Sequence, residues 1–221
     1  MPKKMPAPAP TAAPGRPKSA AKAEAIVAAA QRLFLEQGYG VTSVDTIATA
    51  AGVSKATVYS HFDGKFGLFE AVVAVRQQEL LKRLAPTNEP TGDVRTDLVT
   101  FAVSLSSAVL QPRYRDWDRL VFAESSRHPE LARSLFKAGP KLVHKRLDAI
   151  LSDYAAAGQL AIDDTAAAAE HLIGLVLGFE FVRGLMASQP KRSRRFWTDR
   201  AEGLVDLFLA RYAVGPPERT P

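Results

Sequence analysis

The stretch KATVYSHF, residues 55–62, combines a lysine, hydroxyl groups, a phenol and an imidazole within two helical turns. Val58 and Phe62 are four residues apart and share one apolar helix face, which leaves the polar side chains free. Side chains of these types hydrogen-bond to base edges and to phosphate oxygens. The pattern predicts a helix in the major groove of DNA, with an ordinary solvated surface helix as the alternative.

Two kinds of DNA contact are assigned to different residues. Because the N-terminal residues of such a helix meet the base edges, base contacts are predicted at its start and one turn later, by Lys55, Ala56, Thr57 and Ser60. Phosphate contacts, which set position without selecting sequence, are predicted for Thr42, Tyr59, His61 and Lys65. Ser54 is predicted to cap the helix and to belong to the same surface.

The elements that position this helix can be predicted from apolar spacing. Val44, Ile47, Ala48 and Ala51 form one stripe of a preceding helix, for which Thr42 is the predicted N-cap, in a capping-box pattern with Asp45. Gly52 is predicted to end that helix in a sharp turn. Helices over residues 19–37 and 64–84 are predicted to cover this helix-turn-helix and to link it to the rest of the chain.

Residues 22–82 resemble the DNA-binding domain of TetR/AcrR-type transcriptional regulators. The resemblance is carried by IVAAAQRLFLEQGYGVTSVDTIATAAGVSKATVYSHF and the following GKFGLFEAVV. In that family the matching positions imply phosphate contacts by Tyr59, His61, Lys65 and the cap residue Thr42. The segments RLVFAESSRHPELARSLFKAGP and LIGLVLGFEFVRGLM resemble the C-terminal domain of AefR-like members of the family.

This resemblance implies an all-α protein with a three-helix DNA-binding domain and a C-terminal bundle for ligand binding and dimerisation. Further helices are expected at about 94–110, 113–126, 129–139, 140–157, 165–187 and 193–212. The expected divisions are a Pro/Ala-rich basic disordered tail (1–18), the helix-turn-helix domain (19–66), the ligand-binding and dimerisation domain (67–213) and a disordered C-terminus (214–221).

The resemblance also implies an effector site and a homodimer. Pocket residues of mixed apolar and polar character are predicted to be Trp117, Phe122, His144, His171 and Phe179, although each has the alternative of a core residue. The predicted dimer contacts are Gly174, Gly178, Leu204 and Phe208. Gly174 and Gly178 are four residues apart on an almost entirely apolar helix and allow a second helix to approach closely, with packing inside one chain as the alternative.

Charge is distributed unevenly along the 221 residues, whose formal net charge is +6. Residues 1–18 carry +4, whereas residues 19–66 have as many acidic as basic side chains. The acids Glu24, Glu36 and Asp45 are therefore expected to point away from DNA, and the tail is expected to supply the main non-specific attraction.

Other kinds of chemistry find little support in the sequence. Absence of cysteine excludes disulfides, thiol catalysis and thiolate metal sites, and the four histidines do not have metal-ligand spacing. No cofactor, metal or enzyme activity is predicted, and no membrane partner. We expect a cytoplasmic, ligand-responsive repressor that binds a double-stranded DNA operator and responds to a small hydrophobic or amphipathic effector. The alternatives are a regulator without an effector, and a helical-bundle ligand carrier or enzyme.

Overall fold

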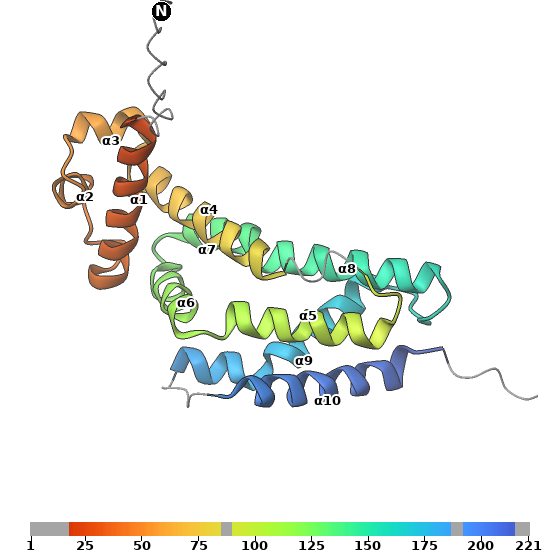
Figure 1. Cartoon of the computed structure of the whole chain (residues 1–221). Coiled ribbons are helices and arrows are strands. Elements are labelled where there is room, and N and C mark those ends of the chain that lie inside the picture. Colours follow the sequence, from red (N-terminus) through yellow and green to blue (C-terminus); the bar gives the residue numbers. More distant parts are fainter. Residues whose placement is uncertain (1–17, 85–89, 187–191, 215–221) are drawn as a thin grey trace, which may run out of the picture.

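The computed structural model describes residues 18–84, 90–186 and 192–214, and the described residues form helices without a β-strand (Figure 1). The helices in chain order are α1 Lys18–Gln37, α2 Val44–Ala50, α3 Lys55–His61, α4 Gly64–Leu84, α5 Val94–Val109, α6 Pro112–Glu124, α7 Pro129–Ala138, α8 Pro140–Ala156, α9 Thr165–Met186 and α10 Arg194–Tyr212. The predicted all-α fold is confirmed. The two tails predicted to be disordered lie outside the described residues, apart from Lys18 and Val214.

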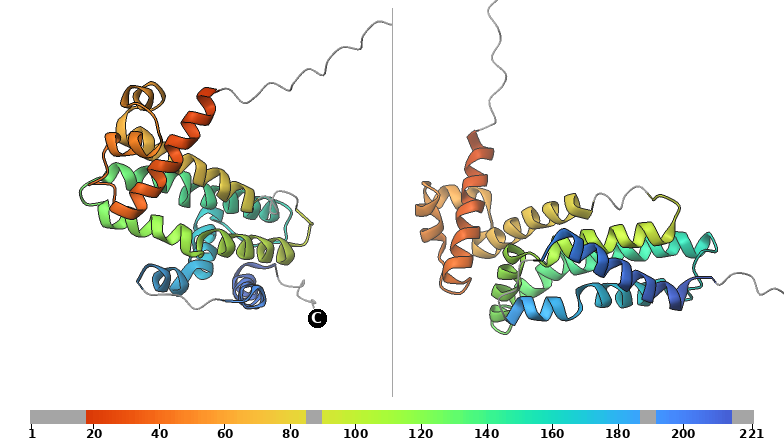
Figure 2. Two further views of the ribbon diagram at one scale, coloured as in Figure 1. Left: turned by 60° about the vertical axis from the view of Figure 1, so that its left-hand side comes forward. Right: turned by 60° about the horizontal axis from the view of Figure 1, so that its bottom comes forward.

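Helices α1 to α3 lie at one end of the molecule in all the views, and α4 leads from them into the C-terminal bundle (Figures 1 and 2). Fully buried side chains of α1, α2 and α3 meet in one hydrophobic core: Ile26, Phe34, Ile47 and Val58. The N-terminal half of α4 adds Leu68, Phe69 and Val72 to it. The predicted boundary at residue 66 therefore falls inside a helix that belongs to both parts of the molecule.

Two helices of the C-terminal part also enter the N-terminal core. Trp117 of α6 and Leu131 of α7 are fully buried there, and the Trp117 ring lies 5.7 Å from Phe69 and 6.5 Å from Phe34, centroid to centroid. The N-terminal unit of α1 to α3 is thus packed on the bundle and not merely tethered to it. A second core, formed mainly by α5, α8, α9 and α10, fills the bundle itself.

Helix α9 is kinked, which differs from the uninterrupted helix predicted over 165–187. Gly178 has φ 37° and ψ −136°, a backbone conformation that side chains with a Cβ rarely adopt. The Arg200 guanidinium of α10 lies 3.4 Å from the Leu175 carbonyl oxygen and 3.5 Å from that of Val176, close to the break. The predicted single helix is therefore divided into two segments at Gly178.

Candidate nucleic-acid interface

Helices α2 and α3 form the predicted helix-turn-helix. Gly52 has φ 66° in the turn between them, as its position after an amphipathic helix predicts. Ile47 and Val58 are fully buried against α1, so each helix has one face fixed in the core. The opposite face of α3 is consequently held toward solvent.

The outward face of α3 carries the residues predicted to contact bases. Lys55, Ala56 and Ser60 are exposed, and Thr57 is half-buried. Ser54 caps the helix as predicted, because its Oγ accepts a hydrogen bond from the Thr57 amide at 3.1 Å. The Ser54 and Thr57 hydroxyls are 2.9 Å apart, so the two oxygens form one hydrogen-bonding unit at the helix start.

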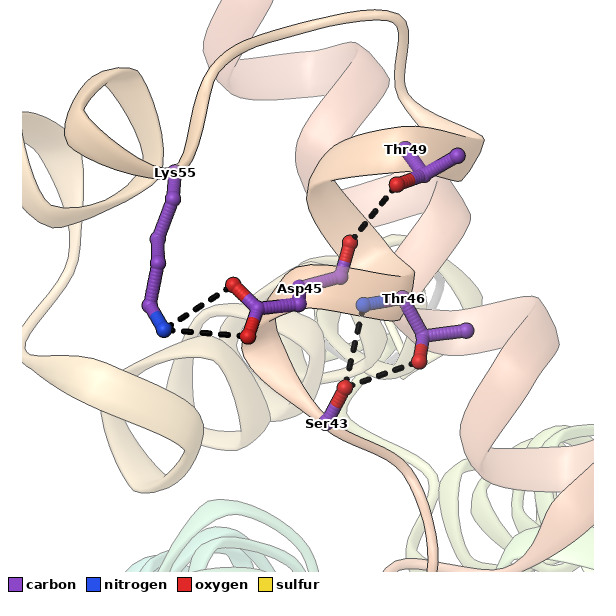
Figure 3. Close-up of polar contacts among 5 residues, drawn as sticks. All are labelled: Ser43, Asp45, Thr46, Thr49 and Lys55. Carbon is purple, nitrogen blue, oxygen red and sulfur yellow. Dashed lines mark hydrogen bonds and ion pairs between the residues drawn. The ribbon is translucent and has the colours of Figure 1, made fainter.

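Lys55 is paired with Asp45 of α2, and its Nζ lies 3.0 Å from each carboxylate oxygen (Figure 3). The expectation that Asp45 points away from the interface is therefore wrong: it lies beside the helix that is predicted to enter the groove. The carboxylate raises the pKa of Lys55 above its ordinary value through a hydrogen bond and charge attraction. Because both side chains are more than half exposed, the pair is weak and DNA phosphates or bases can displace it.

Replacing Asp45 by asparagine is expected to increase DNA affinity about 3- to 10-fold at low salt, because Lys55 becomes available and a negative charge is removed from the interface. Fluorescence anisotropy with labelled duplexes measures this change. Glu36→Gln is the matched control, since Glu36 forms a similarly exposed pair with Arg32 of α1 at 3.4 Å. Equal affinities of parent and Asp45→Asn would mean that Lys55 does not contact DNA.

The predicted cap of α2 is wrong by one residue. Ser43, and not Thr42, accepts the hydrogen bond of the Thr46 amide, at 3.0 Å (Figure 3). Thr42 is only 1% exposed, and its hydroxyl donates to the Gly38 carbonyl oxygen at 2.7 Å, where α1 ends. The Thr42 hydroxyl is thus used in a buried hydrogen bond between the end of α1 and the start of α2, whereas Ser43 is exposed to solvent.

The remaining predicted phosphate contacts lie on and just after α3. Tyr59 is 53% exposed, and His61 is half-buried beside Phe62. Lys65 lies at the start of α4, where its Nζ donates to the carbonyl oxygens of Tyr39 and Gly40 at 2.9 and 3.1 Å. Lys65 therefore anchors the α1–α2 loop as well as placing positive charge near the predicted DNA backbone.

A cavity of about 360 Å³ lies in the C-terminal part, lined by α4, α5, α6, α7, α8 and α9. Of the five predicted pocket residues, only Phe122 lines it. Trp117 is in the N-terminal core, and Phe179 is 69% exposed. The α9 residues that line the cavity are Ile173, Leu177 and Phe181, which are spaced by four residues.

The two histidines predicted for the pocket join helices instead. His144 Nε2 lies 3.0 Å from the Ala166 carbonyl oxygen, and His171 Nδ1 lies 2.8 Å from the Tyr212 hydroxyl. The polar groups that do line the cavity, Arg76, Gln77, Tyr114 and Asp118, were not predicted. The sequence pattern could have indicated Arg76 as a cavity residue, because it places a charge between Val73 and Leu80 on one apolar face of α4.

The predicted dimer residues divide between the surface and the core. Gly174 and Gly178 are exposed, and Leu204 is half-buried. Phe208 is only 2% exposed inside its own bundle, so it cannot contact a second chain; Leu207, one position earlier on α10, is 59% exposed. Among the described residues, no group of three or more His, Cys, Asp or Glu side chains could hold a metal ion.

Comparisons with known proteins agree with this geometry. Residues 26–72 match the family model of bacterial regulatory proteins of the tetR family, and residues 96–214 match the C-terminal domain of AefR-like transcriptional repressors. The solved structure of the flavonoid-responsive regulator FrrA is 31% identical, with a TM-score of 0.77 over 90% of this chain and 98% of that one.

Two sequence relatives differ in how much they cover. An uncharacterised HTH-type transcriptional regulator of Mycobacterium tuberculosis is 28% identical over 82% of both chains. The HTH-type regulator SrpR of Pseudomonas putida is 43% identical over 67 residues, which span 28% of this chain and 32% of that regulator. The helix-turn-helix, the helical bundle and both family matches lead to one conclusion: this chain belongs to the TetR family, whose members are DNA-binding transcriptional regulators and not enzymes.

Proposed function

We propose that the protein is a homodimeric repressor, which binds a pseudo-palindromic operator through α3 of each protomer and leaves it when a small molecule occupies the cavity. The observation that carries this proposal is the position of α6. One face of α6 places Trp117 in the core of the DNA-binding unit, and the neighbouring face places Asp118 and Phe122 at the cavity. A ligand in the cavity therefore contacts the helix on which the DNA-binding unit is packed.

The C-terminal end of α6 gives this contact a route to the helix-turn-helix. Glu124 accepts a hydrogen bond from the Gly40 amide at 3.1 Å, and the His128 ring packs edge-on against Tyr39, 5.0 Å between centroids. Lys65 holds the same α1–α2 loop from the other side. A displacement of α6 would thus alter the orientation of α1 to α3, provided that the effector binds the displaced state more tightly.

Dimerisation is supported by an exposed apolar face on α9 and α10. Its large side chains are Phe179, Val182, Met186 and Leu207, exposed by 69, 44, 84 and 59%. A Cβ built on Gly174 or on Gly203 would meet no atom within 4 Å, so a second helix can approach these backbones closely. Two-fold symmetry through this face would present two α3 helices to successive major grooves.

Helix α9 is the one described helix that is long and apolar enough to cross a membrane. We interpret it as a dimerisation helix of a cytoplasmic protein, because it is kinked at Gly178 and carries Glu180, 93% buried within the protomer. The Glu180 carboxylate lies 3.8 Å from Arg183 and 3.7 Å from Arg192. Such charges favour protein packing over lipid contact.

The effector is proposed to be small and largely apolar. Most side chains that line the cavity are aliphatic or aromatic, and its volume is within the range of small-molecule sites. The name of FrrA, a flavonoid-responsive regulator, supports an aromatic molecule of similar size.

Operator binding can be tested with the purified protein and labelled DNA from upstream of its own gene, beside an unrelated fragment. Thr57→Ala is expected to weaken binding to the operator fragment about 5- to 100-fold and to leave the weak binding to the unrelated fragment unchanged, because a base contact is made only with the specific sequence. Tyr59→Ala is expected to weaken both, because phosphate contacts are independent of sequence.

Thr100→Ala is the control, since Thr100 is a threonine of α5, outside the helix-turn-helix, whose hydroxyl donates to the Thr96 carbonyl oxygen of its own helix at 2.9 Å. Identical affinities of all the variants for both fragments would contradict the proposed role of α3.

A further inference from the structure

The cavity contains one acid and one base on walls that are otherwise mostly apolar. Asp118 of α6 and Arg76 of α4 both line it. The Tyr114 hydroxyl, a further polar group of this wall, donates to Glu79 at 2.8 Å and accepts from Arg83 at 3.2 Å. Asp118, Arg76 and the Gln77 amide are therefore polar groups of this wall that can orient a ligand.

Arg76 has a defined position in this wall. Its guanidinium donates to the Tyr114 carbonyl oxygen at 3.3 Å. The guanidinium carbon lies 5.0 Å from the centroid of the Tyr114 ring and 5.3 Å from that of Trp117. These contacts hold a planar donor at one side of the cavity, where it can meet an acceptor on a ligand.

Asp118 is held in an environment that disfavours its charge. Burial in the cavity wall raises the pKa of its carboxyl to about 6, although the positive charge of Arg76 opposes this shift. Among the described residues, no side chain or backbone amide donates a hydrogen bond to the Asp118 carboxylate. At neutral pH an ionised carboxylate thus faces a mostly apolar space, and a donor on a ligand would stabilise it.

We propose that Arg76 and Asp118 form a hydroxyl-binding pair, which makes the effector a neutral, mainly aromatic molecule with a free phenolic hydroxyl. The hydroxyl donates to Asp118 and accepts from Arg76, while Phe122, Phe136 and Phe181 contact the apolar body. The inference rests on the proposed effector function of this cavity.

The charges argue against the other simple ligand classes. A fatty acid of similar size would bring a carboxylate next to Asp118, and two desolvated anions repel each other. An amine would meet the fixed guanidinium of Arg76. A hydroxyl is both donor and acceptor, so it satisfies both members of the hydroxyl-binding pair without adding charge.

Three matched probes test this selectivity: para-pentylphenol, its methyl ether and para-pentylbenzoate. Binding to the full-length protein is measured at neutral pH by calorimetry and by tryptophan fluorescence, to which Trp117 beside Arg76 contributes. The phenol is expected to bind about 10- to 100-fold more tightly than the ether, which cannot donate, and than the benzoate, which is charged. Equal binding of the three probes, or no binding by any of them, overturns the proposal.

Asp118→Asn is expected to weaken phenol binding about 10-fold and to strengthen benzoate binding, so the preference shrinks or reverses. A variant that only loosened the fold would weaken all three probes together. Asp116→Asn is the matched control, because Asp116 is on the same helix but is exposed and paired with Arg119 at 3.3 Å. Unchanged selectivity in Asp118→Asn overturns the hydroxyl-binding pair.

Operator release is measured separately, by adding each probe to the protein–operator complex. If the phenol binds selectively but leaves operator affinity unchanged, the hydroxyl-binding pair is supported and the effector function of the cavity fails. If release occurs with a ligand class that the pair should reject, the effector function is supported and the pair is overturned.

Discussion

Replacing Leu207 by glutamate is expected to convert the protein into a monomer and to weaken operator binding about 100-fold or more. Leu207 is 59% exposed on α10, on the apolar face that it shares with α9. A carboxylate buried in such an interface without a partner is strongly destabilising. The loss for DNA is large because a dimer binds its second half-site as an intramolecular event, which a monomer cannot do.

Light scattering after gel filtration gives the oligomeric state, and anisotropy with full and half operators gives the affinities. The variant is expected to bind the half operator as well as the parent does, since α3 is untouched. Leu81→Glu is the matched control, because Leu81 is 48% exposed on α4 and outside the α9–α10 face. A Leu207→Glu protein that remains dimeric would place the interface elsewhere.

Asp118→Asn is expected to raise the free energy of unfolding at neutral pH by up to about 3 kcal/mol. The folded protein raises the pKa of Asp118 from 3.8 to about 6, because burial penalises the carboxylate. Between these two values the folded chain retains a proton that the unfolded chain has released. The Asp118 contribution therefore lowers stability as pH rises from about 4 to about 6, and above pH 6 the loss is complete.

The difference in stability between parent and variant isolates the effect of Asp118, because other carboxyls act in the opposite direction. Hydrogen bonds lower the pKa values of Asp93 and Asp206, so their contributions are lost as pH falls. Urea unfolding at several pH values should give a difference near zero at pH 4 that grows to its full size by pH 7. A difference that does not depend on pH would show that Asp118 is not held in an apolar wall.

The helix-turn-helix was predictable from sequence because its determinants are local. The spacing of Val58 and Phe62 identifies the buried face of α3, and Ser54 and Gly52 mark the helix start and the turn. The structure confirms these elements. The cap of α2 was misassigned since Thr42 and Ser43 are adjacent residues that can both cap, and only the packing of the α1 end shows which hydroxyl is already used.

The pairing of Lys55 with Asp45 was outside the reach of sequence patterns. Its two residues are ten positions apart on different helices, so the distance between them depends on the angle of the turn. The dependence on tertiary packing also explains why most pocket residues were predicted wrongly. The walls of the cavity come from six helices, and which side chains face inward depends on how those helices pack.

By itself, the sequence determined the helices, their order and the outward face of α3, because hydrophobic periodicity, caps and glycines act over a few residues. The tertiary structure alone decided that α6 contributes Trp117 to the N-terminal core and Phe122 to the cavity, and that Arg76 and Asp118 line the same cavity. It also decided that Phe181, and not Phe179, faces this cavity. The reason is that Ile173, Leu177 and Phe181 share one face of α9, and only the packing of α9 against the other helices shows which of its faces lines the cavity.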